Sequence, residues 1–431
     1  MNAVVAAGDA SIESRVAALG DGPLTEAALT THVAPLFSRA RAAAGDRIYL
    51  ANHSLGRPLD AMEQDVREGL AAWYATMNGA WDAWMAEGDA YRARLAQLLN
   101  APRSDCVVPK TSAGQGLRAI LNSYGDTGGD GASRGLLRDQ GEVGARRDEL
   151  RVVATRGEFD SLDVILREYA HRRRIDLTFV EPGAGGGFDT ADIVDAIGTR
   201  VDLVVVSEVV FNSGQRIRHL DAIVQRTHGA GGRVLLDVYH SLGAFPVDVA
   251  AQDVDFAVGG SYKYLRGGPG ACFLYLHPRH LDGSLRTLDI GWFAKRDPFA
   301  YQRPDPPQLA PGGDAFLEST PPVLAWYQAR AGQQFALALD VARVRGYSVA
   351  QQKRLIALLA SHGIAARGGV DDHGAFVVVT DRRAGAWRDA LAQRQIVTDA
   401  RGDCLRLCPD VLTTDDELQH AAHALGAIAH A

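Results

Sequence analysis

The chain has 431 residues, a length that favours one large and one small domain over a single hydrophobic core. Hydrophobic residues make up 47% and charged residues 23%, as in ordinary globular proteins, and the net charge of −7 gives no electrostatic reason to expect nucleic acid or an anionic membrane as a partner. Because no run of about 18 apolar residues occurs, we expect no membrane-spanning segment.

The N-terminal part of the chain predicts no targeting signal. Residues 1–22 contain acidic side chains and lack a basic region followed by a long apolar core, so we expect no secretory signal and a cytoplasmic protein. Residues 1–45 are alanine-rich with a helical pattern, and we assign residues 1–50 to an N-terminal arm or a segment of the small domain. Helical spacing returns from Pro58 to Leu99, where recurrent aromatic residues favour a buried helix face.

Thr111 and Ser112 open a further helical pattern that runs to about Leu121. A hydroxyl-bearing turn at a helix N-terminus can bind an anion, because free backbone N–H groups and the helix dipole point outward there. Thr and Ser are also ordinary N-caps, so the signal is weak by itself. Residues 124–149, rich in glycine and in charges of both signs, are predicted to form a mobile insertion.

Short apolar runs then alternate with helical patterns. The runs occupy residues 150–154, 175–180, 201–206, 234–237, 256–258 and 271–276. This alternation predicts an α/β fold with a mostly parallel sheet and helices on both faces, in which ligands bind beyond the strand ends. We expect a large domain over residues 51–320, and a small C-terminal α/β domain over residues 321–431 that begins with a long helix near Pro322.

The cysteines give little sign of metal binding. Cys106, Cys272, Cys404 and Cys408 are scattered along the chain. Cys404 and Cys408 could form half of a metal site, but no second pair and no matching histidines accompany them. We therefore expect four packed side chains and no metal.

An aspartate and a lysine lie at the ends of two consecutive apolar runs. Asp237 ends the run 234–237, and Lys263 follows the run 256–258, between two tyrosines and before a glycine-rich turn. A lysine that forms a Schiff base with pyridoxal phosphate needs a carboxylate at the far end of the cofactor, to keep the pyridine nitrogen protonated. Asp237 is placed to be that carboxylate; the alternative is that Lys263 is an ordinary surface lysine.

Asp-Val-Tyr-His-Ser-Leu-Gly-Ala at 237–244 and Tyr-Lys-Tyr-Leu-Arg-Gly-Gly-Pro-Gly at 262–270 resemble the corresponding segments of kynureninases, within the class V aminotransferase group of fold-type I pyridoxal-phosphate enzymes. The resemblance extends from about Tyr49 to the end of the chain. It implies the fold-type I architecture, pyridoxal 5'-phosphate as cofactor, an amino acid as substrate, and a homodimer whose active sites are shared across the interface.

The resemblance also implies residue roles around the cofactor. Lys263 would hold the cofactor and transfer protons, and Asp237 would pair with the pyridine nitrogen. His240 would lie near the ring, although a lone histidine is often structural, and Phe159 would stack on it. Tyr262 would contact the phosphate.

Further roles concern the phosphate, the dimer and the substrate. Thr111 and Ser112 would cradle the phosphate with Tyr262, Trp292 would lie near the phosphate and substrate unless it is a packing tryptophan, and Thr320 would be contributed across the interface. Arg406 matches an arginine that binds the substrate α-carboxylate, for which a planar fork is suited, with a surface ion pair as the alternative. In the loop near the substrate, Ser54 matches the family, whereas His53 replaces a usual asparagine.

Three departures flank the substrate side-chain pocket. Asp160-Ser161-Leu162 stands where kynureninases have Pro-Thr-Asp, with Asp163 one step further, and Arg266 replaces a usual asparagine. Ser-Glu-Val-Val at 207–210 replaces Thr-His-Val-Asn. The cofactor and amino-acid end of the site is therefore better supported than the aryl-ketone end.

We expect a kynureninase-like hydrolase that cleaves the Cβ–Cγ bond of an amino acid with a γ-carbonyl, such as L-kynurenine or 3-hydroxykynurenine, and releases alanine. Another class V activity, such as transamination, epimerisation or C–S lysis, is the alternative, because these reactions begin with the same activation of the substrate Cα. A third interpretation is a non-catalytic binding protein with this fold, against which the retained Asp237, Lys263 and Arg406 argue.

Overall fold

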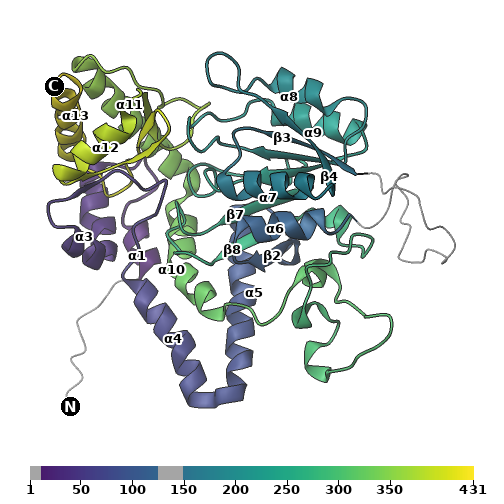
Figure 1. Cartoon of the computed structure of the whole chain (residues 1–431). Helices are drawn as coiled ribbons and strands as arrows, with labels where there is room; N and C mark the ends of the chain where they lie inside the picture. The colour runs from purple at the N-terminus through teal and green to yellow at the C-terminus, as the bar shows by residue number, and fades with distance from the viewer. Residues whose placement is uncertain (1–10, 125–148) are drawn as a thin grey trace.

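The computed structural model describes residues 11–124 and 149–431. The insertion predicted at 124–149 lies, apart from its two end residues, outside the described residues. A seven-stranded sheet forms the centre of the molecule (Figure 1), in the order β2-β8-β7-β6-β5-β3-β4. Its strands are β2 Val107–Lys110, β3 Leu150–Thr155, β4 Ile175–Val180, β5 Leu203–Ser207, β6 Arg233–Asp237, β7 Phe256–Gly260 and β8 Cys272–Leu276.

The prediction of a mostly parallel sheet is confirmed. All neighbouring strands from β4 to β7 pair in parallel, and β8 runs antiparallel to both of its neighbours. Successive side chains of a strand point to opposite faces. In β5, Val204 and Val206 belong to one buried core, whereas Leu203 and Val205 belong to another. The strands read as continuous apolar runs because both faces are covered.

Helices cover both faces of the sheet. One face packs against α6 and α7, and the other against α5, α8, α9 and α10. Their bounds are α5 Ala80–Leu98, α6 Ala113–Leu121, α7 Asp160–His171, α8 Thr190–Ile197, α9 Leu220–Gly229 and α10 Val323–Leu339. The start expected for α10, near Pro322, agrees with the structure to within a residue.

Two long helical patterns are each divided in the structure. The pattern from Pro58 to Leu99 forms α4 (Ala61–Thr76) and α5, joined by a tight turn at Met77, whose φ is 49°. These two helices make the long hairpin that projects from the molecule (Figure 1). Likewise α10 and α11 (Val341–Ser361) are separated at Asp340, which has a φ of 67° and caps α11 with its side chain.

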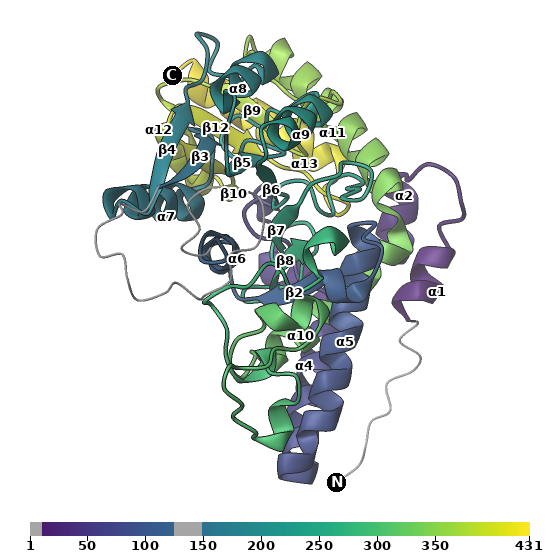
Figure 2. The same ribbon diagram turned by 90° about the vertical axis from the view of Figure 1, so that its right-hand side faces the viewer.

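The C-terminal part forms a second α/β layer (Figure 2). Its antiparallel sheet, in the order β11-β12-β9, is packed against α11, α12 and α13. The bounds are β9 Val377–Thr380, β11 Asp399–Arg401, β12 Cys404–Leu407, α12 Ala384–Gln393 and α13 Asp415–Ala429.

The N-terminal segment joins this C-terminal layer. Its helices α1 (Ile12–Ala17), α2 (Glu26–Ala28) and α3 (Ser38–Ala44) precede β1 (Ile48–Tyr49), which pairs in parallel with β10 (Ile396–Val397). The pairing of β1 with β10 supports our proposal that residues 1–50 belong with the small domain 321–431, whereas α10, at the start of that domain, packs on the central sheet of the large domain over residues 51–320. Within the described residues, no helix has the length and apolarity needed to cross a membrane.

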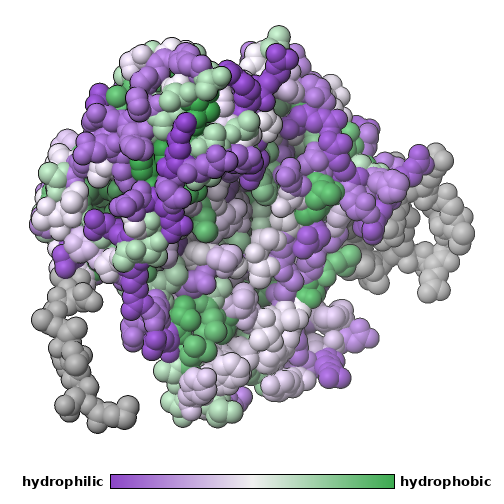
Figure 3. Space-filling model, turned by 60° about the vertical axis from the view of Figure 1, so that its left-hand side comes forward, coloured by the Kyte–Doolittle hydropathy of each residue, from purple (hydrophilic) through white to green (hydrophobic). Residues whose placement is uncertain are grey.

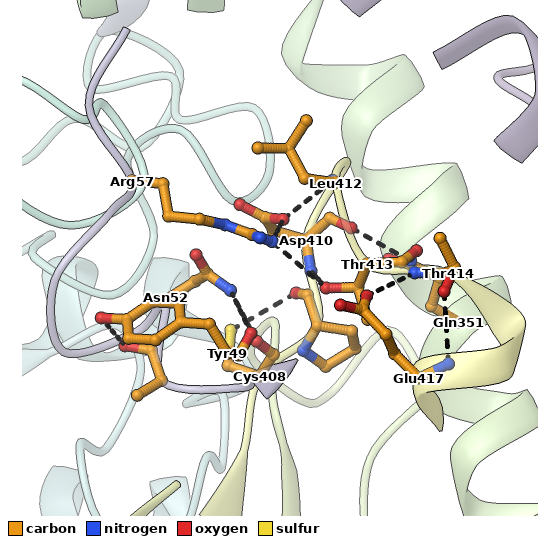
Figure 4. A network of polar contacts seen from close by, with 12 residues as sticks. Tyr49, Asn52, Arg57, Gln351, Cys408, Asp410, Leu412, Thr413, Thr414 and Glu417 are labelled. Carbon is orange, nitrogen blue, oxygen red and sulfur yellow. Dashed lines mark hydrogen bonds and ion pairs between the residues drawn. The ribbon is translucent and has the colours of Figure 1, made fainter. Parts of the chain in front are cut away.

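A buried carboxylate, Asp410, connects three parts of the chain, and Figure 4 shows its contact with Arg57. Asp410 accepts from Arg57 of the loop after β1, and Arg266 Nη1 donates to its Oδ2 at 2.8 Å from the loop after Lys263. Burial alone would raise the pKa of Asp410, but the two arginines lower it to about 2. Removal of either arginine would leave part of the buried Asp410 charge uncompensated. Arg266, one of the departures from the family pattern, thus has a structural partner of its own.

We expect Leu203→Ala to lower the free energy of unfolding by about 2–5 kcal/mol. Leu203 lies on β5, between β3 and β6, and loss of its buried side chain leaves a cavity. Urea unfolding followed by circular dichroism measures this change. Val164→Ala, at an exposed position of α7, is the matched control and should stay within about 0.5 kcal/mol of the unchanged chain. Equal losses in both variants would contradict the assignment of Leu203 to the core.

Candidate functional site

Three neighbouring strands end at the same edge of the sheet and bring polar residues together. Asp237 is the last residue of β6, paired with Ser207 of β5 and Val258 of β7, and Lys263 follows three residues after β7 ends. Both charged side chains are buried, with 5% of Asp237 and 5% of Lys263 exposed. They line a cavity of about 200 Å³, and the predicted site residues that share it are Thr111, Ser112, Phe159, His240 and Tyr262.

The Lys263 amine lies against an imidazole and aromatic rings. Its Nζ is 2.7 Å from His240 Nε2, 5.6 Å from the ring centre of Phe159 and 5.6 Å from that of Tyr262. Burial lowers the pKa of Lys263 to about 7, although Asp237 acts in the opposite direction. Burial, and then the Lys263 charge, also hold the pKa of His240 well below its usual value. A neutral imidazole beside a lysine that titrates near neutrality is suited to proton transfer.

The Asp237 carboxylate accepts a hydrogen bond from one backbone N–H group. Its Oδ1 accepts from the Tyr239 N–H at 2.8 Å, and burial raises its pKa to about 6 against the effects of that N–H and of Lys263. A cation placed beside this carboxylate would restore its ionised form.

Glu158 is a buried acid that the sequence analysis did not single out. Its carboxylate accepts from the Thr155 hydroxyl at 2.7 Å and from the Ser207 hydroxyl at 2.7 Å. Burial raises its pKa to about 7, against these hydrogen bonds, and Asp237 raises it further. The signal available in the sequence was its place directly before Phe159.

The opposite end of the cavity is the N-terminus of α6. Ser112 is the N-cap, and its Oγ accepts from Gln115 N at 3.1 Å. The Thr111 hydroxyl lies 3.1 Å from Gln115 Oε1. The first N–H groups of a helix have no partner within the helix, so this end favours an anion. Lys110 does not serve it, since its amine is buried in contacts with Glu318 and Phe316 O.

An apolar wall closes one side; Phe159 in it was predicted from the sequence, whereas Phe211 was not. Phe159 precedes α7, and its ring meets that of Phe211 edge-on at 5.3 Å. Val209 and Leu162 extend this wall along the cavity.

The predicted substrate residues lie together around Asp399 and do not line the cavity. Arg406 donates through Nη2 to Asp399 and through Nη1 to Phe211 O, while its Nε is buried without a partner. The Ser54 hydroxyl donates to the same Asp399. Only 2% of Arg406 is exposed, so the ion pair that it makes with Asp399 is buried and not at the surface.

His53 completes this group. Its ring stacks on Phe376 at 4.9 Å, and neither ring nitrogen has a hydrogen-bond partner. Complete burial, followed by the charges of Arg406 and Lys263, holds its pKa well below the usual value. His53 is therefore a neutral imidazole with free capacity to donate or accept.

Trp292 and Thr320 are not brought to the cavity of their own chain. Trp292 packs in an aromatic cluster and donates through Nε1 to Pro298 O. The rings of Trp81, Phe293, Phe299 and Tyr301 surround it. Thr320 is exposed. Within one chain the structure therefore agrees with the packing alternative for Trp292.

The departures from the family pattern have local partners. Asp163 pairs with Arg167 one turn along α7, so it does not replace the missing family aspartate in the cavity. Glu208 is buried and accepts from Arg216 at 3.1 Å and from Gln252 at 3.2 Å.

The four cysteines are buried, as predicted. In the part of the chain that the structure describes, no three His, Cys, Asp or Glu side chains gather into a candidate metal site.

The sequence matches the class V aminotransferase family over residues 59–373. It is 31% identical to the kynureninase of Deinococcus radiodurans over 291 residues, which are 65% of this chain and 63% of that protein. It is 27% identical to the kynureninase of Burkholderia mallei over 320 residues, 73% of this chain and 71% of that protein. The chain thus spans somewhat less than two thirds of the Deinococcus relative.

Similar folds occur among solved structures. A C-DES mutant with glycine covalently linked to its PLP cofactor has a TM-score of 0.76 and 18% identity, covering 91% of this chain and 98% of the other. The cysteine desulfurase CsdA from Escherichia coli has a TM-score of 0.74 and 16% identity, covering 95% and 99%. At these identities the likeness shows the fold alone, which is that of fold-type I enzymes.

The cavity has the groups that pyridoxal phosphate requires. Lys263 offers a buried amine, Asp237 a carboxylate for the ring nitrogen, and the start of α6 hydroxyl and N–H groups for the phosphate. Phe159 supplies a flat apolar face. The cofactor is therefore pyridoxal 5'-phosphate, and the chain belongs to the class V aminotransferase family, within which it is kynureninase-like.

Proposed function

We propose that this protein is a cytoplasmic pyridoxal-phosphate enzyme of kynureninase type. It hydrolyses the Cβ–Cγ bond of an amino acid with a γ-carbonyl, such as L-kynurenine or 3-hydroxykynurenine. The main observation in favour of a catalytic role is that a buried Lys263 amine and a buried Asp237 carboxylate line the same cavity. The likeness to two curated kynureninases supports this choice of reaction.

Lys263 and its neighbours would perform the proton transfers. The Lys263 amine, freed by the incoming substrate amine, takes the proton from the substrate Cα and returns a proton later. His240, at 2.7 Å, holds that amine in place by a hydrogen bond. Bound pyridoxal phosphate supplies an electron sink for the pair left at Cα, and Asp237 keeps the proton on its ring nitrogen. Water adds to the γ-carbonyl, the Cβ–Cγ bond breaks, and the products are a carboxylic acid and alanine.

Arg406 would bind the substrate α-carboxylate. Its Nε is a buried donor without a partner, and His53 beside it has two free ring nitrogens. Groups of this kind are costly to bury unless a ligand satisfies them. Arg406 does not line the cavity but donates to the carbonyl of Phe211, which does, so a movement of the Phe211 side chain would accompany substrate binding.

A second candidate is another class V reaction, such as transamination, epimerisation or C–S lysis. It is favoured by the apolar wall of Leu162, Val209 and Phe211, beside which Ser161 is the neighbouring polar side chain for an aryl ketone. Glu208 and Arg266, which replace polar family residues, are occupied by ion pairs with Arg216 and Asp410.

We also propose a homodimer with shared active sites. Trp73, Tyr74 and Met77, near the tip of the α4–α5 hairpin, are exposed, Tyr74 by 84%. Apolar side chains gather on the lower part of the molecule in Figure 3, the end at which this hairpin projects. Exposed apolar groups of this kind mark interaction surfaces. Thr320, remote from the cavity of its own chain, would then serve the site of the partner.

We expect cofactor-free protein to attach pyridoxal phosphate at Lys263 with a rate that rises with pH through about 7. The neutral amine is the nucleophile, and its fraction grows as the pH passes the pKa of Lys263, which burial lowers to about 7. Asp237 acts to raise this pKa, so Asp237→Asn should move the midpoint to lower pH. Absorbance of the bound cofactor follows the rate.

Borohydride reduction and peptide mapping then locate the attachment. The chain has four lysines, at 110, 263, 295 and 353. Lys110 is also buried, so Lys110→Arg is the matched control and should still attach the cofactor, whereas Lys263→Arg should not. A label on another lysine, or a midpoint near the ordinary lysine value of 10.5, would contradict this assignment.

The loaded enzyme should convert L-kynurenine or 3-hydroxykynurenine to alanine and a fluorescent anthranilate-type acid. Asp237→Asn should raise the barrier by about 3–5 kcal/mol, since a neutral amide cannot hold the pyridinium proton. Asp389→Asn, an exposed position on α12, serves as control and should retain activity. Release of a keto acid, or of sulfide from cysteine, without alanine from either kynurenine would support the second candidate instead.

Light scattering should give a mass twice the 46.1 kDa of the chain. Placing charges on the hairpin, in Trp73→Lys combined with Tyr74→Lys, should shift the protein toward the monomer because the apolar contact is lost. Val164→Lys, on exposed α7, should leave the mass unchanged. A monomer in the unchanged protein would refute the shared active site.

A further inference from the structure

A carboxylate that no sequence signal singled out holds the proposed substrate arginine. Asp399 of β11 is the cross-strand partner of Arg406 in β12, so the antiparallel register places the two side chains beside each other. Asp399 Oδ2 accepts from Arg406 Nη2 and from the Ser54 hydroxyl, and Asp399 Oδ1 accepts from Arg401 Nη1 at 2.8 Å. Asp399 thus joins the loop after β1 to both strands of the hairpin.

The Arg406 guanidinium is fixed at two of its nitrogens. Asp399 holds Nη2, and Phe211 O holds Nη1. The remaining nitrogen, Nε, is buried and has no partner. Because two nitrogens of the planar guanidinium are held, the Nε–H of Arg406 points in one fixed direction. A fixed donor can bind a carboxylate with little further loss of side-chain entropy.

The charges around Asp399 leave Arg406 able to attract an anion. One carboxylate, Asp399, lies between two guanidinium groups, those of Arg401 and Arg406. Burial acts to raise the pKa of Asp399, but the Ser54 hydroxyl and Arg406 hold it below its usual value, so Asp399 is ionised. His53 Nε2 lies 3.7 Å from Asp399 Oδ2 and is neutral, because its pKa is held well below the usual value. The group therefore retains a net positive charge.

We propose that Asp399 is a positioning residue, which orients Arg406 for the α-carboxylate of the substrate. This inference rests on the proposed role of Arg406 in amino-acid binding. Asp399 does not touch the reacting atoms and acts only through the arginine. Its loss should therefore reduce recognition of the carboxylate while recognition of the amine stays the same.

The test compares L-alanine with ethylamine, which lacks only the carboxylate. Affinity of each for the cofactor-loaded enzyme is measured from the change in cofactor absorbance, without turnover. In the unchanged enzyme L-alanine should bind more tightly than ethylamine. Asp399→Asn should reduce this affinity ratio at least about tenfold, as a misplaced fork loses a charge-assisted hydrogen bond. Asp399→Glu should restore part of the ratio, and ethylamine affinity should not change.

Two further variants separate the possible outcomes. Arg406→Lys should also reduce the ratio, since lysine keeps the charge and loses the fork. Asp381→Asn, which removes an exposed partner of Arg383 in the same domain, should retain the full ratio. If Asp399→Asn does not yield folded protein, Asp399→Ser provides a second neutral variant for the same measurement.

An unchanged ratio in the neutral Asp399 variant, together with a reduced ratio in Arg406→Lys, would overturn the role of Asp399 and leave that of Arg406 intact. An unchanged ratio in Arg406→Lys would instead overturn the proposed carboxylate site. A parallel loss of L-alanine and ethylamine affinity in the Asp399 variants would show a general structural role and also overturn the inference.

Discussion

The site depends on charge buried at one edge of a sheet. Parallel pairing of β5, β6 and β7 places Ser207, Asp237 and the chain leading to Lys263 next to one another. Helices cover both faces, so water reaches these groups poorly. Burial moves the pKa of Asp237 up to about 6 and that of Lys263 down to about 7. Two groups that are normally charged at neutral pH are therefore brought close to their titration points, where a bound cofactor can decide their protonation.

Two carboxylates in the C-terminal α/β layer, Asp410 and Asp399, each lie between two arginines but have different roles. Asp410 accepts from Arg57 and Arg266, and this cluster ties the loop after Lys263 to the C-terminal part of the chain. Asp399 accepts from an exposed and a buried arginine, and the buried one retains a free donor. The same arrangement of charges thus stabilises the contact between layers in one case, and in the other it leaves a buried arginine donor free, which we propose binds the substrate.

The sequence predicted the parts of the fold that depend on local pattern. Strands buried on both faces appear as continuous apolar runs, and Asp237 and Lys263 follow directly from the ends of two such runs. The division of helices at Met77 and Asp340 was missed: at Asp340 the positive φ falls on a residue without a neighbouring glycine, whereas at Met77 the following Asn78-Gly79 was an available turn signal. Asp399 and Phe211 were missed for another reason. They meet Arg406 through strand pairing and domain contact, which leave no mark on local spacing.

The pairing of β1 with β10 has a consequence for biosynthesis. The loop that carries His53 and Ser54 is made early, yet its partners come from the last part of the chain: Asn52 Nδ2 donates to Cys408 O, 356 residues away. Such distant contacts are formed late, since the chain between them must be ordered first. A chain that ends before Cys408 lacks the partners of this loop and cannot complete its contacts. An ordered loop at His53 and Ser54 therefore requires that synthesis has reached the C-terminal strands.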